Sequence, residues 1–199
     1  MSFSSGRHWV RSTIEDKYQF LRSLIDFFNC PLRQCECEVI DGAQRLAKEI
    51  ANGDEEIERS EMDKLLDSFY NSQDNRNLFY QSILIMGYSY YESSLGLIEQ
   101  ELGKQCQSIN NYNINSTNIQ TNKKWIKSDV RLMRNFLVHN NSVKPTKGQD
   151  EAIKRLRSKY PGIHYDSNGI TITSDDCVVD FLNTEYEVLR YLCMLVGFN

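Results

Sequence analysis

Apolar residues recur every three or four positions along most of the chain, which is the spacing of one face of an α-helix. This pattern predicts helices over residues 12–29, 32–50, 55–70, 78–102, 121–139, 150–159 and 176–196. Ser12 to Glu15 has the form of a capping box that starts the first helix. Pro31 ends that helix, because proline disfavours helical geometry at the preceding residue. The stretches 52–54 and 71–77 are predicted as connections between helices.

Two stretches depart from helical spacing. Residues 103–122 contain an asparagine-rich run and are predicted to form a long loop. Residues 163–165 and 170–173 alternate apolar and polar positions around a turn sequence, which is typical of a β-hairpin. The apolar positions expected to let the last helix close the bundle are Val178, Leu182, Leu189, Leu192 and Val196. The predicted fold class is therefore all-α, a helical bundle with one small β-hairpin before the last helix.

Composition narrows the possible partners. The chain has 199 residues, enough for one domain or for one domain with an extension. Its formal net charge of −4 excludes a basic field over the whole molecule, so any contact with nucleic acid has to be local. The first six residues have no apolar core of a signal peptide, so reduced cysteines in the cytoplasm are expected. The most apolar run, residues 83–86, is too short to cross a membrane.

The stretch from Trp125 to His139 carries the candidate chemistry. On a helical wheel its apolar residues occupy one broad arc, and its polar and basic residues occupy the other. Arg134 and His139 are five residues apart, which separates them by about 140° of rotation and about 7.5 Å of rise on an ideal helix. They are therefore not stacked. We expect the helix end at Asn140 and Asn141 to turn His139 toward a groove, particularly one shared with a second copy of the helix.

These residue types suit the cleavage of RNA without a metal ion. Histidine titrates near neutral pH and can move a proton to or from the 2′-hydroxyl or the leaving 5′-oxygen. Arginine supplies a fixed, forked positive charge where negative charge develops on the phosphorus. Asn135, directly after Arg134, is expected to orient either partner by hydrogen bonding. The alternative is that Arg134 and His139 are ordinary solvated residues on a polar helix face.

The motif Arg134–Asn135, three apolar residues and His139, followed by Asn140 and Asn141, resembles the HEPN family, whose name stands for higher eukaryotes and prokaryotes nucleotide-binding. The upstream stretch 88–95, rich in tyrosine and containing Glu92, is similar to a segment found in these proteins. The resemblance covers residues 78–142 well, the last helix loosely and the first seventy residues hardly at all. It implies a HEPN-like helical domain over residues 75–199, preceded by an N-terminal helical extension over residues 1–74.

The resemblance implies a metal-independent endoribonuclease without a cofactor, with a composite site at a two-fold homodimer interface. The catalytic residues implied are Arg134, Asn135 and His139, with RNA as the substrate. Similar proteins act as toxins or antiviral effectors, so an antitoxin or inhibitor protein is a possible partner, and no membrane association is expected. Two alternatives remain: a non-catalytic HEPN-like module that binds a nucleotide or a protein, and a helical partner subunit in which the motif is coincidental.

Further residues have expected roles around the motif. The resemblance implies that Glu92 orients Arg134 or contacts the site, and Tyr91 supports it, although both also fit a solvated acid and a core aromatic. The basic residues expected to form a phosphate track are Lys124, Lys127 and Arg131, which otherwise form a solvated face. Asp129 falls inside the apolar arc, so we expect it to pair with a cation of another helix. Cys30, Cys35 and Cys37 lack the paired spacing of a zinc site, so no metal is expected.

Overall fold

The computed structural model describes residues 8–51, 55–104, 107–109, 112–139, 144–167 and 169–198, with side chains for all of these except 28, 30–40, 43, 46, 49–50 and 61–75. Over these residues the elements are α1 (His8–Ala51), α2 (Glu55–Gly103), α3 (Thr117–Trp125), the π-helix η2 (Ile126–Val130), α4 (Arg131–His139), α5 (Lys147–Lys159), β1 (Ile163–Asp166), β2 (Gly169–Ile172) and α6 (Asp176–Leu195). The prediction of an all-α fold with one small hairpin before the last helix is confirmed.

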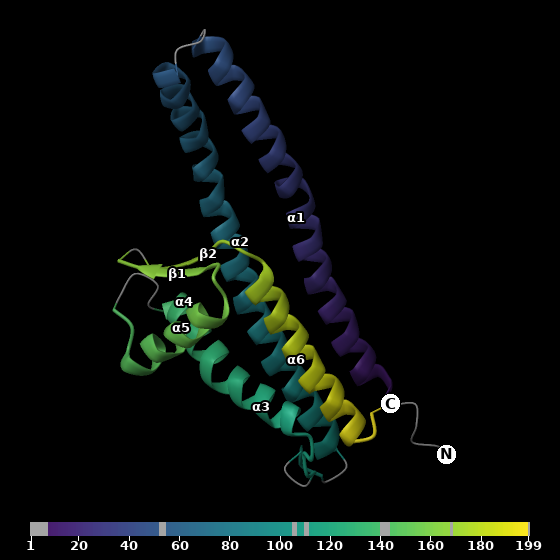
Figure 1. Ribbon diagram of the computed structural model, residues 1–199. Helices are drawn as coiled ribbons and strands as arrows, with labels where there is room; N and C mark the ends of the chain where they lie inside the picture. The colour runs from purple at the N-terminus through teal and green to yellow at the C-terminus, as the bar shows by residue number, and fades with distance from the viewer. Residues whose placement is uncertain are drawn as a thin grey trace.

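Two long helices form the frame of the molecule. Figure 1 shows α1 and α2 packed side by side as an antiparallel hairpin, one end of which projects beyond the other elements. At the opposite end α6 lies along both helices, and α3 packs on its other side, while α4 packs on α2 and α5 (Figure 1). The five apolar positions predicted for the last helix, Val178, Leu182, Leu189, Leu192 and Val196, are all buried. The core therefore lies where α6 meets α1, α2 and α3.

The first helix is longer than predicted, and two predicted boundaries are wrong. It begins at His8, so Ser12 lies inside it and is no cap, while Glu15 accepts hydrogen bonds from Gln19 and from Tyr186 of α6. The backbone also continues as a helix through Pro31 to Ala51. Packing of α1 along α2 outweighs the cost of proline in a helix interior, which is about 3 kcal/mol. The predicted stop at residues 52–54 lies outside the described residues.

The predicted connection over residues 71–77 is also wrong, because α2 is continuous from Glu55 to Gly103. The polar residues at this point dock the hairpin to the helix. The Asn77 side-chain oxygen accepts the backbone N–H of Ile172 at 2.8 Å, and the Gln81 amide donates to the carbonyl of Ile170 at 2.7 Å. These bonds give partners to the backbone N–H of Ile172 and the carbonyl of Ile170 on the outer edge of β2, which no second strand pairs. The predicted division into two domains between residues 74 and 75 stays a prediction. The boundary falls within α2. Val10 and Ile14 of α1 belong to the same core as the rest of the bundle.

The short elements follow the predicted pattern with small shifts. β1 and β2 pair antiparallel from Ile163 opposite Ile172 to Asp166 opposite Gly169. The predicted loop over residues 103–122 is shorter than expected, because α3 already begins at Thr117, where the Ser116 hydroxyl accepts the N–H of Ile119. A full capping box formed by Thr146 and Gln149 starts α5.

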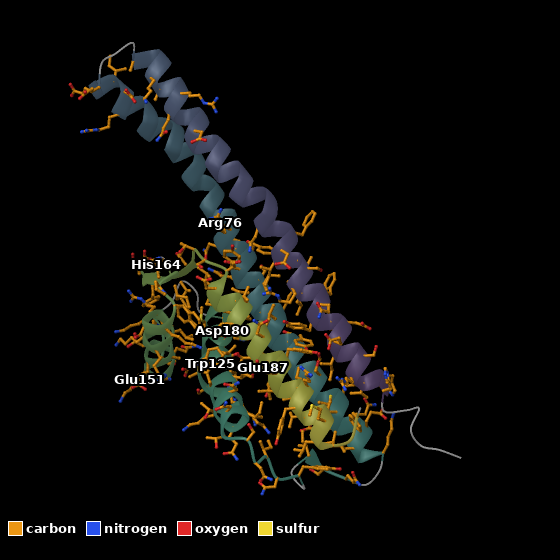
Figure 2. All side chains as sticks on the ribbon, turned by 45° about the vertical axis from the view of Figure 1, so that its right-hand side comes forward. Arg76, Trp125, Glu151, His164, Asp180 and Glu187 are labelled. Carbon is orange, nitrogen blue, oxygen red and sulfur yellow. The ribbon has the colours of Figure 1, made fainter. Side chains whose placement is uncertain are left out.

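Lys159 of α5 contacts residues of both α6 and α3. The ammonium of Lys159 lies 2.8 Å from a carboxylate oxygen of Asp180 on α6 and 4.5 Å from the centre of the Trp125 ring. Figure 2 shows Trp125 and Asp180 together on facing elements. The Trp125 ring in turn packs on Phe181, at a centroid distance of 5.0 Å. This contact holds the end of α3 against α5 and α6, and so fixes where the following π-helix begins.

A close approach of α2 and α6 encloses an acid. A Cβ atom at Gly87 would lie 2.8 Å from a methyl carbon of Leu182 and 3.3 Å from an Oε atom of Glu185, so a larger residue here would force the Leu182 side chain to move. Glu185 is 1% exposed, and neither of its carboxyl oxygens has a hydrogen-bond partner among the described residues. Burial raises the pKa of Glu185 well above its ordinary value, so the carboxyl is held neutral in the core.

The neutral state of Glu185 predicts how stability depends on pH. Because its folded pKa is raised, its contribution to stability is fully present below the unfolded pKa of about 4.3 and is lost as pH rises toward the folded pKa, by at most about 1.4 kcal/mol per pH unit. We expect Glu185→Gln, which is neutral at every pH, to gain stability relative to the native chain as pH is raised from about 5 to about 8. Urea unfolding at both pH values measures this, and a constant difference would contradict it.

Candidate functional site

The candidate site lies on one continuous helical segment built from α3, η2 and α4. In the middle of this segment the backbone widens into a π-helix, and the N–H of Arg131 reaches back to the carbonyl of Ile126, five residues earlier. One extra residue in a turn rotates the following side chains by about 100° relative to an ideal wheel. The directions of Arg131, Arg134 and His139 therefore depend on this turn as well as on their spacing.

A salt bridge fixes the π-helix from outside. Asp129 is 5% exposed, and both of its carboxylate oxygens accept hydrogen bonds from Arg155 of α5, the shortest at 2.7 Å. The expectation that Asp129 pairs with a cation on another helix is confirmed. Since the bond is bidentate, it resists rotation of η2 about its axis and holds α4 in place.

Arg134 and Asn135 lie together at the start of the motif. The Arg134 guanidinium donates a hydrogen bond of 3.0 Å to the side-chain oxygen of Asn135, and both residues are half-buried. The Nε atom of Arg134 is buried and has no hydrogen-bond partner among the described residues. A guanidinium held in this way is oriented, yet keeps donor capacity for a ligand.

The charges around Tyr88 place α2 beside the motif. The pKa of the Tyr88 hydroxyl is raised, first by burial and then by the negative charge of Glu92. The positive charges of Arg131 and Arg134 lower that pKa in turn. All four groups therefore act at one place, where α2 meets α4. Tyr88 is the member of this cluster that was not among the predicted site residues; its position four residues before Glu92 on a helix is the signal that indicates it.

The remaining predicted residues lie at different depths. His139 is exposed at the last residue of α4, and no hydrogen bond joins it to Arg134 within the described chain. Tyr91 is 2% exposed, and its ring lies 6.4 Å from that of Tyr88. Its hydroxyl has no hydrogen-bond partner among the described residues, and its pKa is raised by burial and by Glu185. The Asn140 and Asn141 exit lies outside the described residues.

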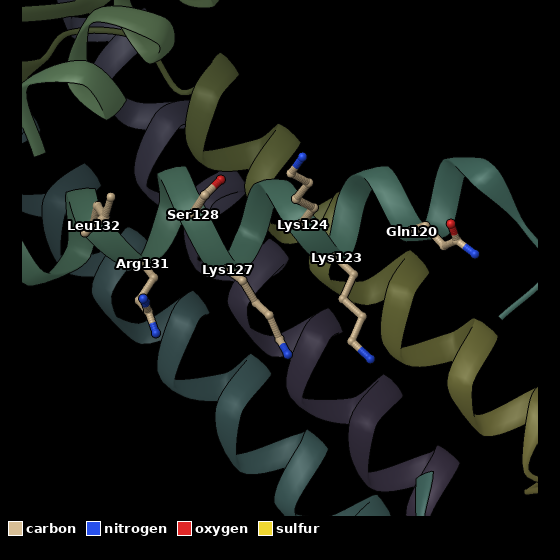
Figure 3. A pocket seen from close by; sticks show the side chains of 7 residues that line it. All are labelled: Gln120, Lys123, Lys124, Lys127, Ser128, Arg131 and Leu132. Carbon is tan, nitrogen blue, oxygen red and sulfur yellow. The ribbon is translucent and has the colours of Figure 1, made fainter. Parts of the chain in front are cut away.

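A basic groove leads away from this cluster along the outside of the helical segment. It has a volume of about 580 Å³ and includes the three predicted RNA-binding residues, Lys124, Lys127 and Arg131. The other lining residues are Gln120, Lys123, Ser128 and Leu132. Figure 3 shows the side chains of Lys123, Lys127 and Arg131 extending in one direction from the helix, whereas those of Lys124 and Ser128 extend in the other. Lys123 was missed by the sequence prediction, although its spacing of four residues before Lys127 indicates a shared face.

Among the described side chains, no cluster of three or more His, Cys, Asp or Glu residues is arranged to hold a metal ion. The side chains of Cys30, Cys35 and Cys37 lie outside that description.

Comparison of the chain with protein-family models, with curated proteins and with solved structures finds no match. None of the described helices has the length and apolar character needed to cross a lipid bilayer.

The anchoring of the π-helix is testable through stability. We expect Asp129→Ala to lower the free energy of unfolding by about 1.5–3 kcal/mol, because it removes charge-assisted bonds at a buried carboxylate. The matched control is Asp150→Ala, whose carboxylate pairs with Lys154 at 2.6 Å on the exposed side of α5. That surface pair should contribute only about 0.2–1 kcal/mol. Urea denaturation followed by circular dichroism compares them, and equal losses would show that the Arg155 pair does not anchor the turn.

Proposed function

We propose that this protein is a metal-independent RNA endoribonuclease of HEPN type. The observation that carries the proposal is the oriented Arg134–Asn135 pair at the end of a basic groove, in a chain whose net charge is −4. A local basic surface on an acidic protein is suited to binding one polyanionic ligand rather than to non-specific binding of anions. The exposed His139 on the same helix supplies the group that moves protons.

The proposed reaction uses the RNA itself as the nucleophile. The 2′-hydroxyl attacks the adjacent phosphorus, the new P–O2′ bond forms, and the P–O5′ bond breaks. The products are a 2′,3′-cyclic phosphate and a 5′-hydroxyl. His139 moves the proton from the 2′-oxygen or to the 5′-oxygen, and Arg134 stabilises the charge that develops on the phosphoryl oxygens. Because DNA lacks the 2′-hydroxyl, it is not cleaved.

Glu92 and Asn135 orient the arginine in this scheme. Asn135 accepts one guanidinium bond, and Glu92 lies with Tyr88 at the same end of α4. Fixing the guanidinium before the substrate arrives lowers the cost of reorganising it in the transition state. A cytoplasmic toxin or antiviral effector fits such an activity, and an antitoxin or inhibitor protein would restrain it.

The site is completed in this proposal by a second copy of the chain. Arg134 and His139 point to different sides of one helix, so a groove between two copies brings the arginine of one near the histidine of the other. The outer face of α2 is suited to this contact. Gly96 has nothing within 4 Å of where a Cβ atom would lie, so no contact within the chain requires a glycine there. Met86 and Val138 are 40% and 42% exposed and would be covered by the partner.

A second candidate function is a non-catalytic HEPN-like module that binds a nucleotide or a protein. The observation that favours it is the acid beside the arginines, since the charge of Glu92 acts on the same cluster as Arg131 and Arg134. An acid at this place weakens the attraction for RNA and for a nucleotide alike, so within this second function it favours a protein ligand. Cleavage assays distinguish the two functions.

We expect Arg134→Ala and His139→Ala each to abolish detectable RNA cleavage while leaving the fold intact. Losing a positioned acid or base costs about 10²–10⁴-fold in rate, and losing an electrostatic donor about 10²–10³-fold. Asn135→Ala should cost less, since water can replace an orienting bond. The assay is cleavage of a mixed RNA pool with a chelator present, and circular dichroism checks folding. Chelator-sensitive cleavage, or full activity of folded His139→Ala, would exclude this mechanism.

The dimer is tested by a charged, bulky residue on the proposed interface. We expect Gly96→Arg to give an inactive monomer without loss of folding, because arginine is a better helix former than glycine by up to about 1 kcal/mol. The matched control is Gly42→Arg on α1, where a Cβ atom likewise meets nothing within 4 Å. Light scattering at micromolar concentration measures the oligomeric state. A native chain that is monomeric and still cleaves RNA would overturn the prediction.

A further inference from the structure

The groove beside the motif contains a regular row of positive charges. Lys123, Lys127 and Arg131 follow one another at intervals of four residues and extend in the same direction (Figure 3). On a helix this interval corresponds to about 6 Å along the axis. Arg131 ends the row next to Arg134, since the charges of both act on the hydroxyl of Tyr88. The row therefore leads directly into the candidate catalytic cluster.

Few negatively charged groups lie close to the positive charges of this row. Within the described residues, no carboxylate lies within salt-bridge distance of Lys123, Lys127 or Arg131. The pKa of Lys123 is lowered, first by burial and then by the neighbouring Lys127, while Glu99 of α2 raises it. Half-burial of a lysine beside another cation costs free energy unless an anion occupies the space between them. Positive charge is therefore concentrated along this face.

The spacing of the row distinguishes between anions. A nucleoside triphosphate presents its charges on adjoining phosphates, whereas a polynucleotide presents one charge per nucleotide along an extended backbone. Single cations one helical turn apart are suited to the second arrangement. The groove also has an apolar part, formed by Leu132 and by the aliphatic stems of the lysines, on which sugars or bases can lie. The row follows the outside of one helix, which suits a flexible single strand better than a rigid duplex.

We propose that the row of Lys123, Lys127 and Arg131 binds successive phosphates of a single-stranded RNA on one side of the bond that is cleaved. The scissile phosphate lies at Arg134, and the flanking strand runs along η2 and α3 toward Gln120. This inference rests on the proposed ribonuclease function and specifies its substrate. Recognition through phosphates alone carries no sequence information, so the row positions the strand and sets the length that the enzyme requires.

Binding is measured with a short single-stranded DNA, which has the phosphates but no 2′-hydroxyl and is therefore not consumed. For three phosphate contacts, the logarithm of the affinity should fall with the logarithm of the salt concentration with a slope of about −2. We expect Lys123→Gln and Lys127→Gln each to reduce this slope by about 0.7. The matched control is Lys154→Gln on α5, which removes the same charge away from the groove and should leave affinity and slope unchanged.

Cleavage provides the second measurement. We expect the native protein to cleave a longer single-stranded RNA with a higher kcat/KM than a dinucleotide. Lys123→Gln should remove most of that advantage, whereas Lys154→Gln should leave the kcat/KM of both substrates unchanged. If no RNA is cleaved while the DNA binding responds as expected, the ribonuclease function fails and the groove assignment stands. Unchanged binding in both Lys123→Gln and Lys127→Gln, or tighter binding of a nucleoside triphosphate than of the strand, would overturn the groove assignment.

Discussion

Burial of α6 against α1, α2 and α3 is the interaction on which the rest of the structure depends. Its apolar residues fill the space between the two long helices, and Gly87 allows α2 to approach it closely enough to enclose Glu185. Fully burying one such apolar side chain stabilises the fold by about 1.5–3 kcal/mol. The same helix carries Phe181 and Asp180, which hold Trp125 and Lys159 in place. The bundle thus fixes Trp125 at the end of α3, where the π-helix begins.

The π-helix that follows is held by charge as well as by the burial of Ile126 and Val130. Removing a carboxylate from water is costly, and the bidentate bonds between Asp129 and Arg155 offset this cost while they fix the geometry. They hold a turn that is wider than an α-helix, and this turn sets the direction of Arg131 and Arg134 relative to Tyr88 and Glu92 on α2. A straight α-helix with the same sequence would present these arginines at a different angle.

Features that depend on local spacing could be predicted from the sequence. The apolar period predicts the last helix, alternation predicts the hairpin, and a lone acid on an apolar arc predicts the Asp129 pair. Features that depend on tertiary contacts could not. Pro31 and the polar stretch 71–77 resemble helix ends, but packing along the α1–α2 hairpin continues one helix, and hydrogen bonds to β2 use the polar residues of the other. Lys123 is an exception, because its spacing of four residues before Lys127 already indicates a shared helix face, and Lys124 extends in the other direction (Figure 3).

In the candidate site Arg134 is held in place while His139 is exposed, and this difference suits the roles proposed for the two residues. Arg134 is half-buried and hydrogen-bonded, as a group that stabilises developing charge should be, because an electrostatic stabiliser is effective only when it is already oriented. His139 is exposed at a helix end, where a proton-transferring group can meet a ligand or a second chain. If Arg134 and His139 act on one phosphate as proposed, their separation of about 140° on one helix favours a site shared between two copies of the chain.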